Sequence, residues 1–257
     1  MMVLAATFFI VLFLDEGVDR MKLNALTINL FADGAEMADL LAWYKNPLIK
    51  GFTTNPTLMK KSGITDCRKF AKELLQAIPD RPISFEVFSD DIVEMERQAL
   101  AISALAENVY VKIPITDSQG QFTFKLIEKL AQQGIKQNIT ALTTVEHVVQ
   151  VSQLLGTHTP AYLSVFAGRI ADTGIDPVPL MAKALQILKE KPNQELIWAS
   201  SREVLNIIQA ENIHCPIITV TPSLLKKLSG LGRDLNEVSL ETVKMFRNDA
   251  IEAEFVL

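Results

Sequence analysis

The chain has 257 residues, of which 49% are hydrophobic and 21% charged, and its formal net charge is −5. This composition can bury one large core or two modest ones. The acidic balance and the dispersed basic residues exclude the positive face that nucleic-acid binding requires, so the expected partner is a small molecule. Cys67 and Cys215 are the only cysteines and lack metal-ligand spacing, which predicts a reduced, cytoplasmic protein. No metal or other cofactor is expected.

The N-terminal segment is an almost unbroken apolar run over residues 3–14. It is too short to span a bilayer, and it lacks the basic residues and the cleavage site of a clear signal peptide. We predict that translation naturally starts at Met21, so that residues 1–20 are a start-site artefact or a disordered, apolar extension. A poor signal peptide is the alternative. Residues 21–257 are expected to form one domain with no membrane segment.

Short β-branched runs alternate with longer amphipathic segments after Met21. The predicted strands cover residues 25–31, 51–54, 83–87, 109–113, 137–139, 161–165, 195–199 and 217–220. Segments between them place apolar residues three and four apart, as helices on a sheet require; examples are 92–105, 122–133, 145–155 and 178–189. Eight such units predict an α/β fold, one closed (β/α)8 TIM barrel.

Two points about this architecture stay open. A doubly wound open sheet is the alternative fold, although no Gly-x-Gly-x-x-Gly turn follows the first predicted strand. A further amphipathic helix over residues 240–255 lies outside the eight units. It is expected to cap the barrel mouth or to contact a neighbouring subunit, so a homo-oligomer is compatible with the sequence.

Lys112 interrupts an otherwise apolar and β-branched run over residues 109–115. Burial disfavours a charged ammonium and brings a lysine pKa down towards neutrality. A neutral amine is a nucleophile that forms Schiff bases with carbonyl substrates. The alternative is a lysine that extends its charged end from the strand into water.

Polar residues follow seven of the predicted strands, at the ends where a parallel barrel carries its chemistry. In chain order they are Asp33, Thr53-Thr54-Asn55, Glu86, Lys112, Asn138 with Thr140, Ser164 with Arg169, and Ser200-Ser201-Arg202. Singly, each is compatible with a turn or a helix cap, but together they indicate an enzyme site. Lys112, Glu86 and Asn138 suit Schiff-base chemistry. Arg169 and Arg202 match phosphate geometry, which indicates a sugar phosphate.

In order and spacing, these residues resemble the transaldolase family, which includes the fructose-6-phosphate aldolases. The segments that carry the resemblance are 51–58 (GFTTNPTL), 111–114 (VKIP), 138–140 (NIT), 164–169 (SVFAGR) and 199–202 (ASSR). The resemblance implies a (β/α)8 barrel and a class I, metal-independent mechanism in which Lys112 forms a Schiff base with a ketose phosphate. It assigns Asp33 to proton transfer during carbon–carbon cleavage. It assigns Glu86, through a water held with Thr140, to proton transfer during imine formation and hydrolysis.

The resemblance also implies a set of substrate-binding residues. Asn55 and Asn138 would orient the dihydroxyacetone unit. Arg169, Arg202 and Ser164 would hold the phosphate, and Ser200 and Phe166 would border the substrate.

At positions 86 and 166 the chain has Glu and Phe, which resembles the pattern of the transaldolases. The aldolases have a pattern with Gln and Tyr at these positions. The chain length is nearer the compact aldolases. Val165, Ser201 and the triplet 32–34 depart from the family pattern beside the substrate site, which leaves the sugar open. We expect transfer of a dihydroxyacetone unit from fructose-6-phosphate or sedoheptulose-7-phosphate to an aldose phosphate, in the pentose phosphate pathway. The alternatives are aldol cleavage that releases free dihydroxyacetone, and a transaldolase-like protein that only binds sugar phosphates.

Overall fold

The computed structural model of the chain describes residues 25–256. The extension predicted over residues 1–20 lies outside the described residues. The chain divides into two compact units, one formed by Thr27–Leu228 and the other including the C-terminal residues from Ser229 onward. The candidate site lies in the first of these units.

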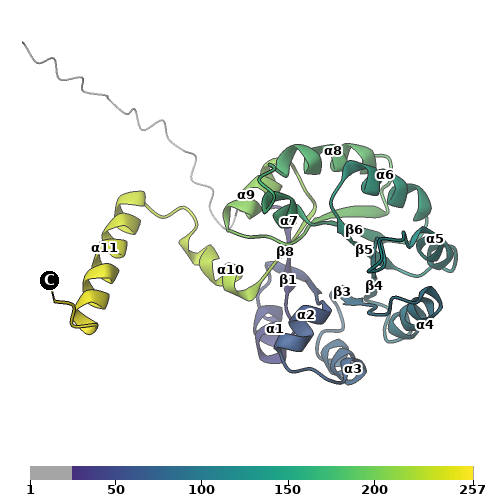
Figure 1. Ribbon diagram of the computed structural model, residues 1–257, viewed down its shortest axis with the longest axis horizontal. Coiled ribbons are helices and arrows are strands. Elements are labelled where there is room, and N and C mark those ends of the chain that lie inside the picture. The colour runs from purple at the N-terminus through teal and green to yellow at the C-terminus, as the bar shows by residue number, and fades with distance from the viewer. Residues whose placement is uncertain (1–24, 257) are drawn as a thin grey trace, which may run out of the picture. The chain divides into compact units, whose positions relative to one another are not determined.

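The first unit is a closed barrel of eight parallel strands that follow one another in sequence order (Figure 1). The strands are β1 (Asn29–Asp33), β2 (Ile49–Thr53), β3 (Ile83–Glu86), β4 (Val109–Pro114), β5 (Gln137–Leu142), β6 (Ala161–Val165), β7 (Gln194–Trp198) and β8 (Ile217–Val220). β1 pairs with β8 and closes the ring. The predicted (β/α)8 TIM barrel is therefore confirmed.

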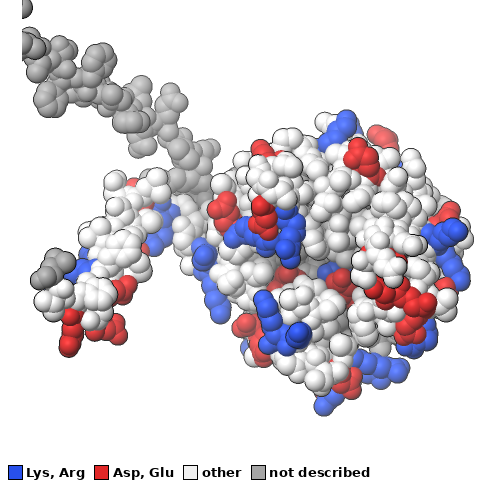
Figure 2. Space-filling view, in the orientation of Figure 1, with Lys and Arg blue, Asp and Glu red and all other residues white. Residues whose placement is uncertain are grey.

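One or two helices follow each strand, and most of these helices lie outside the ring (Figure 1). They are α1 (Met37–Tyr44), α2 (Pro56–Lys61), α3 (Cys67–Ala77), α4 (Ile92–Ser103), α5 (Phe124–Gln132), α6 (Val145–Leu154), α7 (Ala167–Ala171), α8 (Val178–Leu188), α9 (Leu205–Asn212) and α10 (Pro222–Lys227). Each amphipathic helix buries one face against the strands; α5, for example, buries Leu126, Ile127 and Leu130. Charged side chains of both signs are intermixed on the face shown in Figure 2.

Several turns that leave the strands lead directly into a helix with a side-chain cap. The Asn55 Oδ1 atom accepts a hydrogen bond from the Leu58 amide at 3.0 Å, and Thr144 Oγ1 accepts one from the His147 amide at 3.1 Å. Such caps satisfy amides that the first helical turn leaves free. They also set where each chain segment turns away from the barrel mouth, which positions the polar residues around that mouth.

The first strand begins later than predicted, at Asn29 instead of residue 25. The carboxylate of Glu211 accepts the backbone amides of Thr27 and Ile28, so these residues are held by a side chain and not by a strand ladder. Pairing with β8 begins at Asn29 opposite Ile217. The strand also ends later than predicted, at Asp33 instead of residue 31, and the Asp33 side chain lies at the barrel mouth.

Aromatic side chains fill the barrel below the mouth. The Tyr110 and Tyr162 rings stack at 4.1 Å between centroids, and Phe31 meets Tyr162 edge to face at 5.7 Å. A Cβ on Gly51 would lie 2.5 Å from the Phe31 ring, so only glycine fits there. Phe166 packs against this cluster. The candidate site therefore has an apolar floor, and burial raises the pKa of Tyr162 well above its usual range and keeps the phenol neutral.

The C-terminal residues form the additional helix that the sequence predicts. This helix, α11 (Leu235–Glu252), begins five residues before the predicted start because the Asp234 carboxylate accepts the amides of Asn236 and Glu237 and caps it there. Its side chains include exposed apolar residues such as Val243 and Phe246. Within residues 25–256, neither α11 nor any other helix is long and apolar enough to cross a membrane.

Candidate active site

A cavity of about 420 Å³ lies at the C-terminal ends of the strands; we call it the Lys112 cavity. Most of the predicted site residues line it, and they come from seven different strands or the turns that follow them. They are Asp33, Asn55, Glu86, Lys112, Thr140, Ser164, Phe166, Arg169 and Ser200. Asn138 and Arg202 are the two predicted residues that do not contribute to the cavity wall.

Lys112 and Glu86 form an ion pair inside this cavity. The two residues are direct neighbours in the β3–β4 register, and Lys112 Nζ lies 3.1 Å from Glu86 Oε2. The same nitrogen donates a hydrogen bond to the Thr54 carbonyl oxygen at 2.9 Å. The Lys112 side chain is only 7% exposed, so its amine lies inside the cavity and does not extend into bulk water. A carboxylate thus lies within proton-transfer distance of a buried amine.

Thr140 presents a buried hydroxyl to the same cavity. The residue is 2% exposed, and its Oγ1 atom has no hydrogen-bond partner among the residues that the structure describes. An unpaired buried hydroxyl costs free energy unless a partner satisfies it. Thr140 is therefore available to bind a polar group of a molecule that enters the cavity.

Asp33 is held by a chain of hydroxyl groups. Thr53 Oγ1 donates a hydrogen bond to Asp33 Oδ1 at 2.8 Å, and the Thr219 hydroxyl lies 2.6 Å from that of Thr53. Since the Thr53 proton is used on Asp33, Thr219 is the donor to Thr53. Burial raises the pKa of the Asp33 carboxyl above its ordinary value, while the charge of Lys112 and the hydrogen bond from Thr53 lower it in part.

Sequence reasoning missed Thr219, and it noted Thr53 without assigning it to the site. Both residues line the Lys112 cavity. A threonine in the eighth predicted strand was the available signal, because the same rule that pointed to the other seven strand ends applies to β8. Its closeness to Thr53 depends on barrel closure, since 166 residues separate the two in the sequence.

Replacing Asp33 with asparagine is expected to stabilise the fold in a pH-dependent way. The stability associated with a raised carboxyl pKa is fully present below the ordinary value of about 3.9 and is lost as pH rises through the raised value. Asparagine does not titrate, so the difference in Tm between Asp33→Asn and the unmodified protein should increase with pH through that window. For a chain of this size, 1 kcal/mol corresponds to roughly 2–4 °C in Tm.

Thermal unfolding between about pH 4 and pH 8 measures this difference. Asp80→Asn is the matched control, because Asp80 is exposed. Its carboxylate accepts a hydrogen bond from the Tyr44 hydroxyl at 2.7 Å, and the amide oxygen of asparagine can accept the same hydrogen bond. A Tm difference for Asp33→Asn that stays constant or shrinks as pH rises would show that the ionised, buried Asp33 carboxylate does not destabilise the fold.

Asn138 is fully buried behind the cavity wall. Its Oδ1 atom accepts a hydrogen bond from Ser164 Oγ at 2.7 Å, and its Nδ2 atom donates one to Ser84 Oγ at 3.0 Å. The side-chain amide is therefore engaged with protein groups at both ends. In this arrangement Asn138 orients Ser164, which does line the cavity.

Arg169 and Ser200, which follow β6 and β7, line the part of the cavity wall beyond Ser164. Ser200 has a φ of 63°, in the left-handed region, and a Cβ on Gly168 would lie 1.7 Å from the Ser200 carbonyl oxygen. This close approach requires glycine before Arg169. Arg202 instead points to Asp172, with Nε 3.1 Å from Oδ1. The hydrogen bonds from Arg202 hold the pKa of the Asp172 carboxyl below its usual range.

The Lys112 cavity combines an amine, two carboxylates, several hydroxyl groups and a guanidinium. Within residues 25–256, no three His, Cys, Asp or Glu side chains are placed to hold a metal ion together. The groups present are those that an amine nucleophile and proton transfer require.

Comparison with known proteins gives the family. The model of the transaldolase/fructose-6-phosphate aldolase family matches residues 30–256. A protein described as a probable transaldolase from Dehalococcoides mccartyi is 32% identical over 202 residues, which cover 78% of this chain and 90% of the relative. One with the same description from Methanococcus maripaludis is 33% identical over 202 residues, which cover 78% and 89%.

A solved structure supports the fold independently. The crystal structure of 2,3-dimethylmalate lyase, a member of the PEP mutase/isocitrate lyase superfamily, has a TM-score of 0.51 and 11% sequence identity, and the match covers 89% of this chain and 84% of that one. At this identity the likeness concerns the barrel alone. The family match extends over most of the chain, from β1 to the C-terminal helix, and the chain therefore belongs to the transaldolase/fructose-6-phosphate aldolase family.

Proposed function

We propose that the protein is a transaldolase that transfers a dihydroxyacetone unit from fructose-6-phosphate or sedoheptulose-7-phosphate to an aldose phosphate. The observation that carries this proposal is the buried Lys112 amine, 3.1 Å from the Glu86 carboxylate, in a cavity of a size suited to a small substrate. The reaction is metal-independent and places the protein in the pentose phosphate pathway of the cytoplasm.

Imine formation is the first chemical step. The Lys112 amine attacks the ketose carbonyl carbon, and the carbinolamine that results loses its hydroxyl as water. Glu86 supplies and removes the protons of this step through a water held with Thr140. The unpaired, buried Thr140 hydroxyl and the closeness of Glu86 to the amine support these roles.

Carbon–carbon cleavage follows on the imine. Asp33 accepts the proton of the substrate hydroxyl next to the breaking bond, the aldose phosphate leaves, and the bonding electrons pass into the enamine on Lys112. An aldehyde acceptor then takes up these electrons in a new carbon–carbon bond, and hydrolysis of the imine restores the amine. The raised pKa of Asp33 suits a group that both accepts and returns a proton.

Arg169 is the proposed phosphate ligand, with Ser164 and Ser200 as neutral donors in the same cavity. Replacing Arg169 with alanine is expected to raise KM for fructose-6-phosphate roughly 10- to 100-fold, the range for loss of hydrogen bonds to a charged group. KM for unphosphorylated dihydroxyacetone should scarcely change. Steady-state kinetics on both donors measures the effect, and equal losses on the two would assign Arg169 a structural role.

Arg202 has a competing partner, since its guanidinium already pairs with Asp172. It would have to leave that carboxylate to bind a substrate phosphate. We expect Arg202→Ala to raise KM for the phosphorylated donor less than Arg169→Ala does. In the unmodified protein, the free energy needed to break the Arg202–Asp172 ion pair reduces what Arg202 contributes to phosphate binding. Asp172→Asn should instead lower the KM of the phosphorylated donor, because it frees the Arg202 guanidinium from its ion pair.

The assay that tests the proposed function follows fructose-6-phosphate with and without erythrose-4-phosphate as acceptor. A transaldolase forms sedoheptulose-7-phosphate with the acceptor and releases little dihydroxyacetone without it. Efficient release without acceptor would identify the second candidate, a fructose-6-phosphate aldolase, which the compact chain length favours. No turnover of either kind would leave only sugar-phosphate binding.

A further inference from the structure

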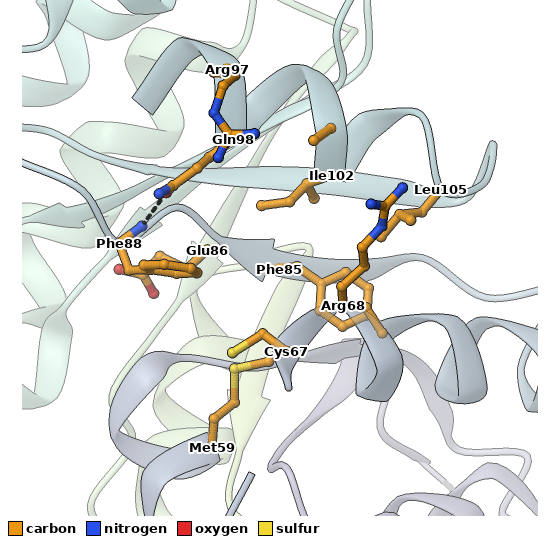
Figure 3. A pocket seen from close by; sticks show the side chains of 12 residues that line it. Met59, Cys67, Arg68, Phe85, Glu86, Phe88, Arg97, Gln98, Ile102 and Leu105 are labelled. Carbon is orange, nitrogen blue, oxygen red and sulfur yellow. Dashed lines mark hydrogen bonds between the residues drawn. The ribbon is translucent and has the colours of Figure 1, made fainter. Parts of the chain in front are cut away.

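A second cavity, of about 290 Å³, lies between α3 and α4 at the end of β3 (Figure 3); we call it the Arg68 cavity. Most of its lining residues are apolar: Met59, Ala71, Phe85, Phe88, Ala101, Ile102 and Leu105. Glu86 contributes to this cavity as well as to the Lys112 cavity. None of the steps proposed for sugar transfer uses the Arg68 cavity.

The rim of the Arg68 cavity is held by a network of hydrogen bonds. Gln98 Oε1 accepts a hydrogen bond from the Phe88 backbone amide at 2.9 Å (Figure 3). Gln98 Nε2 in turn donates to Glu94 Oε1 at 3.1 Å. The network fixes the backbone beneath the Phe88 ring, although that residue is 62% exposed. An exposed aromatic residue held at the rim of an apolar cavity is a surface that a ligand would cover.

The charge of the Arg68 cavity is unbalanced. Arg97 pairs with Glu94 at 2.6 Å, and Glu86 pairs with Lys112, so these groups neutralise one another. Arg68 forms no ion pair or hydrogen bond with another residue that the structure describes. It lies at the end of the cavity away from Phe88 (Figure 3). The cavity therefore pairs an aromatic surface at one end with a free cation at the other.

We propose that the Arg68 cavity binds a compact aromatic carboxylate, with its rings on the apolar walls beside Phe85 and Phe88 and its carboxylate at Arg68. A cavity of about 150 Å³ holds benzene, so 290 Å³ has room for a bicyclic ring system. A single guanidinium matches one negative charge. A doubly charged phosphate would need a second cation, and Arg97, the other guanidinium of this cavity, is already paired with Glu94.

Binding of 2-naphthoate tests this proposal directly. Titration calorimetry on the full chain should show saturable binding at one site per chain. The variant Arg169→Ala, which removes the guanidinium that lines the Lys112 cavity but not the Arg68 cavity, should bind 2-naphthoate as well as the unmodified protein does. Competition by fructose-6-phosphate, or loss of binding in Arg169→Ala, would place the ligand in the Lys112 cavity and overturn the proposal. This outcome is distinct from failure of the proposed function, which is measured by turnover.

Two pairs of variants locate the ligand. Arg68→Gln should weaken 2-naphthoate about tenfold and leave the neutral 2-naphthylmethanol unchanged. Its matched control is Lys69→Gln, which removes the same charge from the next residue, where the side chain does not line the cavity. Ala101→Phe should abolish binding of both compounds by filling the cavity, whereas Ala104→Phe, outside the lining, should not. Equal binding by all four variants would overturn the proposal.

Cys67 provides a local readout because it lines the Arg68 cavity. Cys215, the other cysteine, is 2% exposed, so iodoacetamide should alkylate Cys67 selectively. Saturating 2-naphthoate should slow alkylation of Cys67 at least about fivefold if the ring system occupies the cavity. Peptide mass mapping measures the rate at each cysteine. An unchanged rate at Cys67 under saturating ligand would contradict the assigned site.

Discussion

Borohydride added during turnover of fructose-6-phosphate is expected to attach the substrate irreversibly to Lys112, and Lys112→Ala is expected to abolish both this adduct and turnover. The amine is the group that carries the substrate, and removing a covalent nucleophile costs as much as about 10⁶-fold in rate. Among residues 25–256, no other lysine is buried, and Lys112 Nζ also lies 3.1 Å from a carboxylate oxygen of Glu86. Mass mapping of peptides from the reduced protein identifies the lysine that reacted.

Lys136→Ala is the control for this prediction. Lys136 follows α5, and its Nζ atom donates a hydrogen bond to the Glu107 carbonyl oxygen at 2.7 Å in an exposed setting. Its loss should leave both the adduct on Lys112 and the turnover rate unchanged. An adduct on a different lysine, or none in the unmodified protein, would contradict the proposed mechanism at its first step.

Replacing Glu86 with glutamine should slow transfer roughly 10²- to 10⁴-fold, the usual contribution of one acid/base group. Glutamine keeps the shape of the side chain but cannot move a proton between the carbinolamine and a water at Thr140. The imine should therefore form and hydrolyse slowly, and single-turnover kinetics should show the loss in those steps. Glu96→Gln is the matched control, since it breaks the Glu96–Lys129 ion pair on the surface and should leave the rate unchanged.

Phe166 is expected to influence whether the dihydroxyacetone unit is transferred or released. Its ring lines the Lys112 cavity without a hydroxyl, so it cannot help to activate the water that would hydrolyse the intermediate. Phe166→Tyr supplies a hydroxyl and should raise the ratio of acceptor-independent release of dihydroxyacetone to transfer. Product analysis with and without acceptor gives this ratio, and an unchanged or lower ratio would remove Phe166 from the explanation.

The order and type of the elements could be predicted from the sequence. Apolar periodicity distinguished strands from helices, and the strands β6 (Ala161–Val165) and β8 (Ile217–Val220) begin and end where predicted. Lys112 in an apolar run and polar residues at strand ends indicated the position of a site because both signals are local. The residues that repeat a known family pattern added their expected roles before any geometry was available.

The contacts within the site depended on the tertiary structure. The Lys112–Glu86 ion pair follows from the register of two neighbouring strands, and the Thr219–Thr53–Asp33 chain exists only because β8 closes the barrel against β1. Strand register and barrel closure join residues that are distant in the sequence, so no local pattern encodes them.

The positions of Asn138 and Arg202 show the same limit. Asn138 is the second residue of β5, and Arg202 lies beyond the end of β7. The amide of Asn138 is engaged by Ser84 and Ser164, and Arg202 pairs with Asp172. The sequence alone determined the residue types around the mouth of the barrel. Which of those side chains line the cavity depended on hydrogen-bond and charge partners from other βα units, because most polar groups that folding brings inside pair with a nearby complementary group.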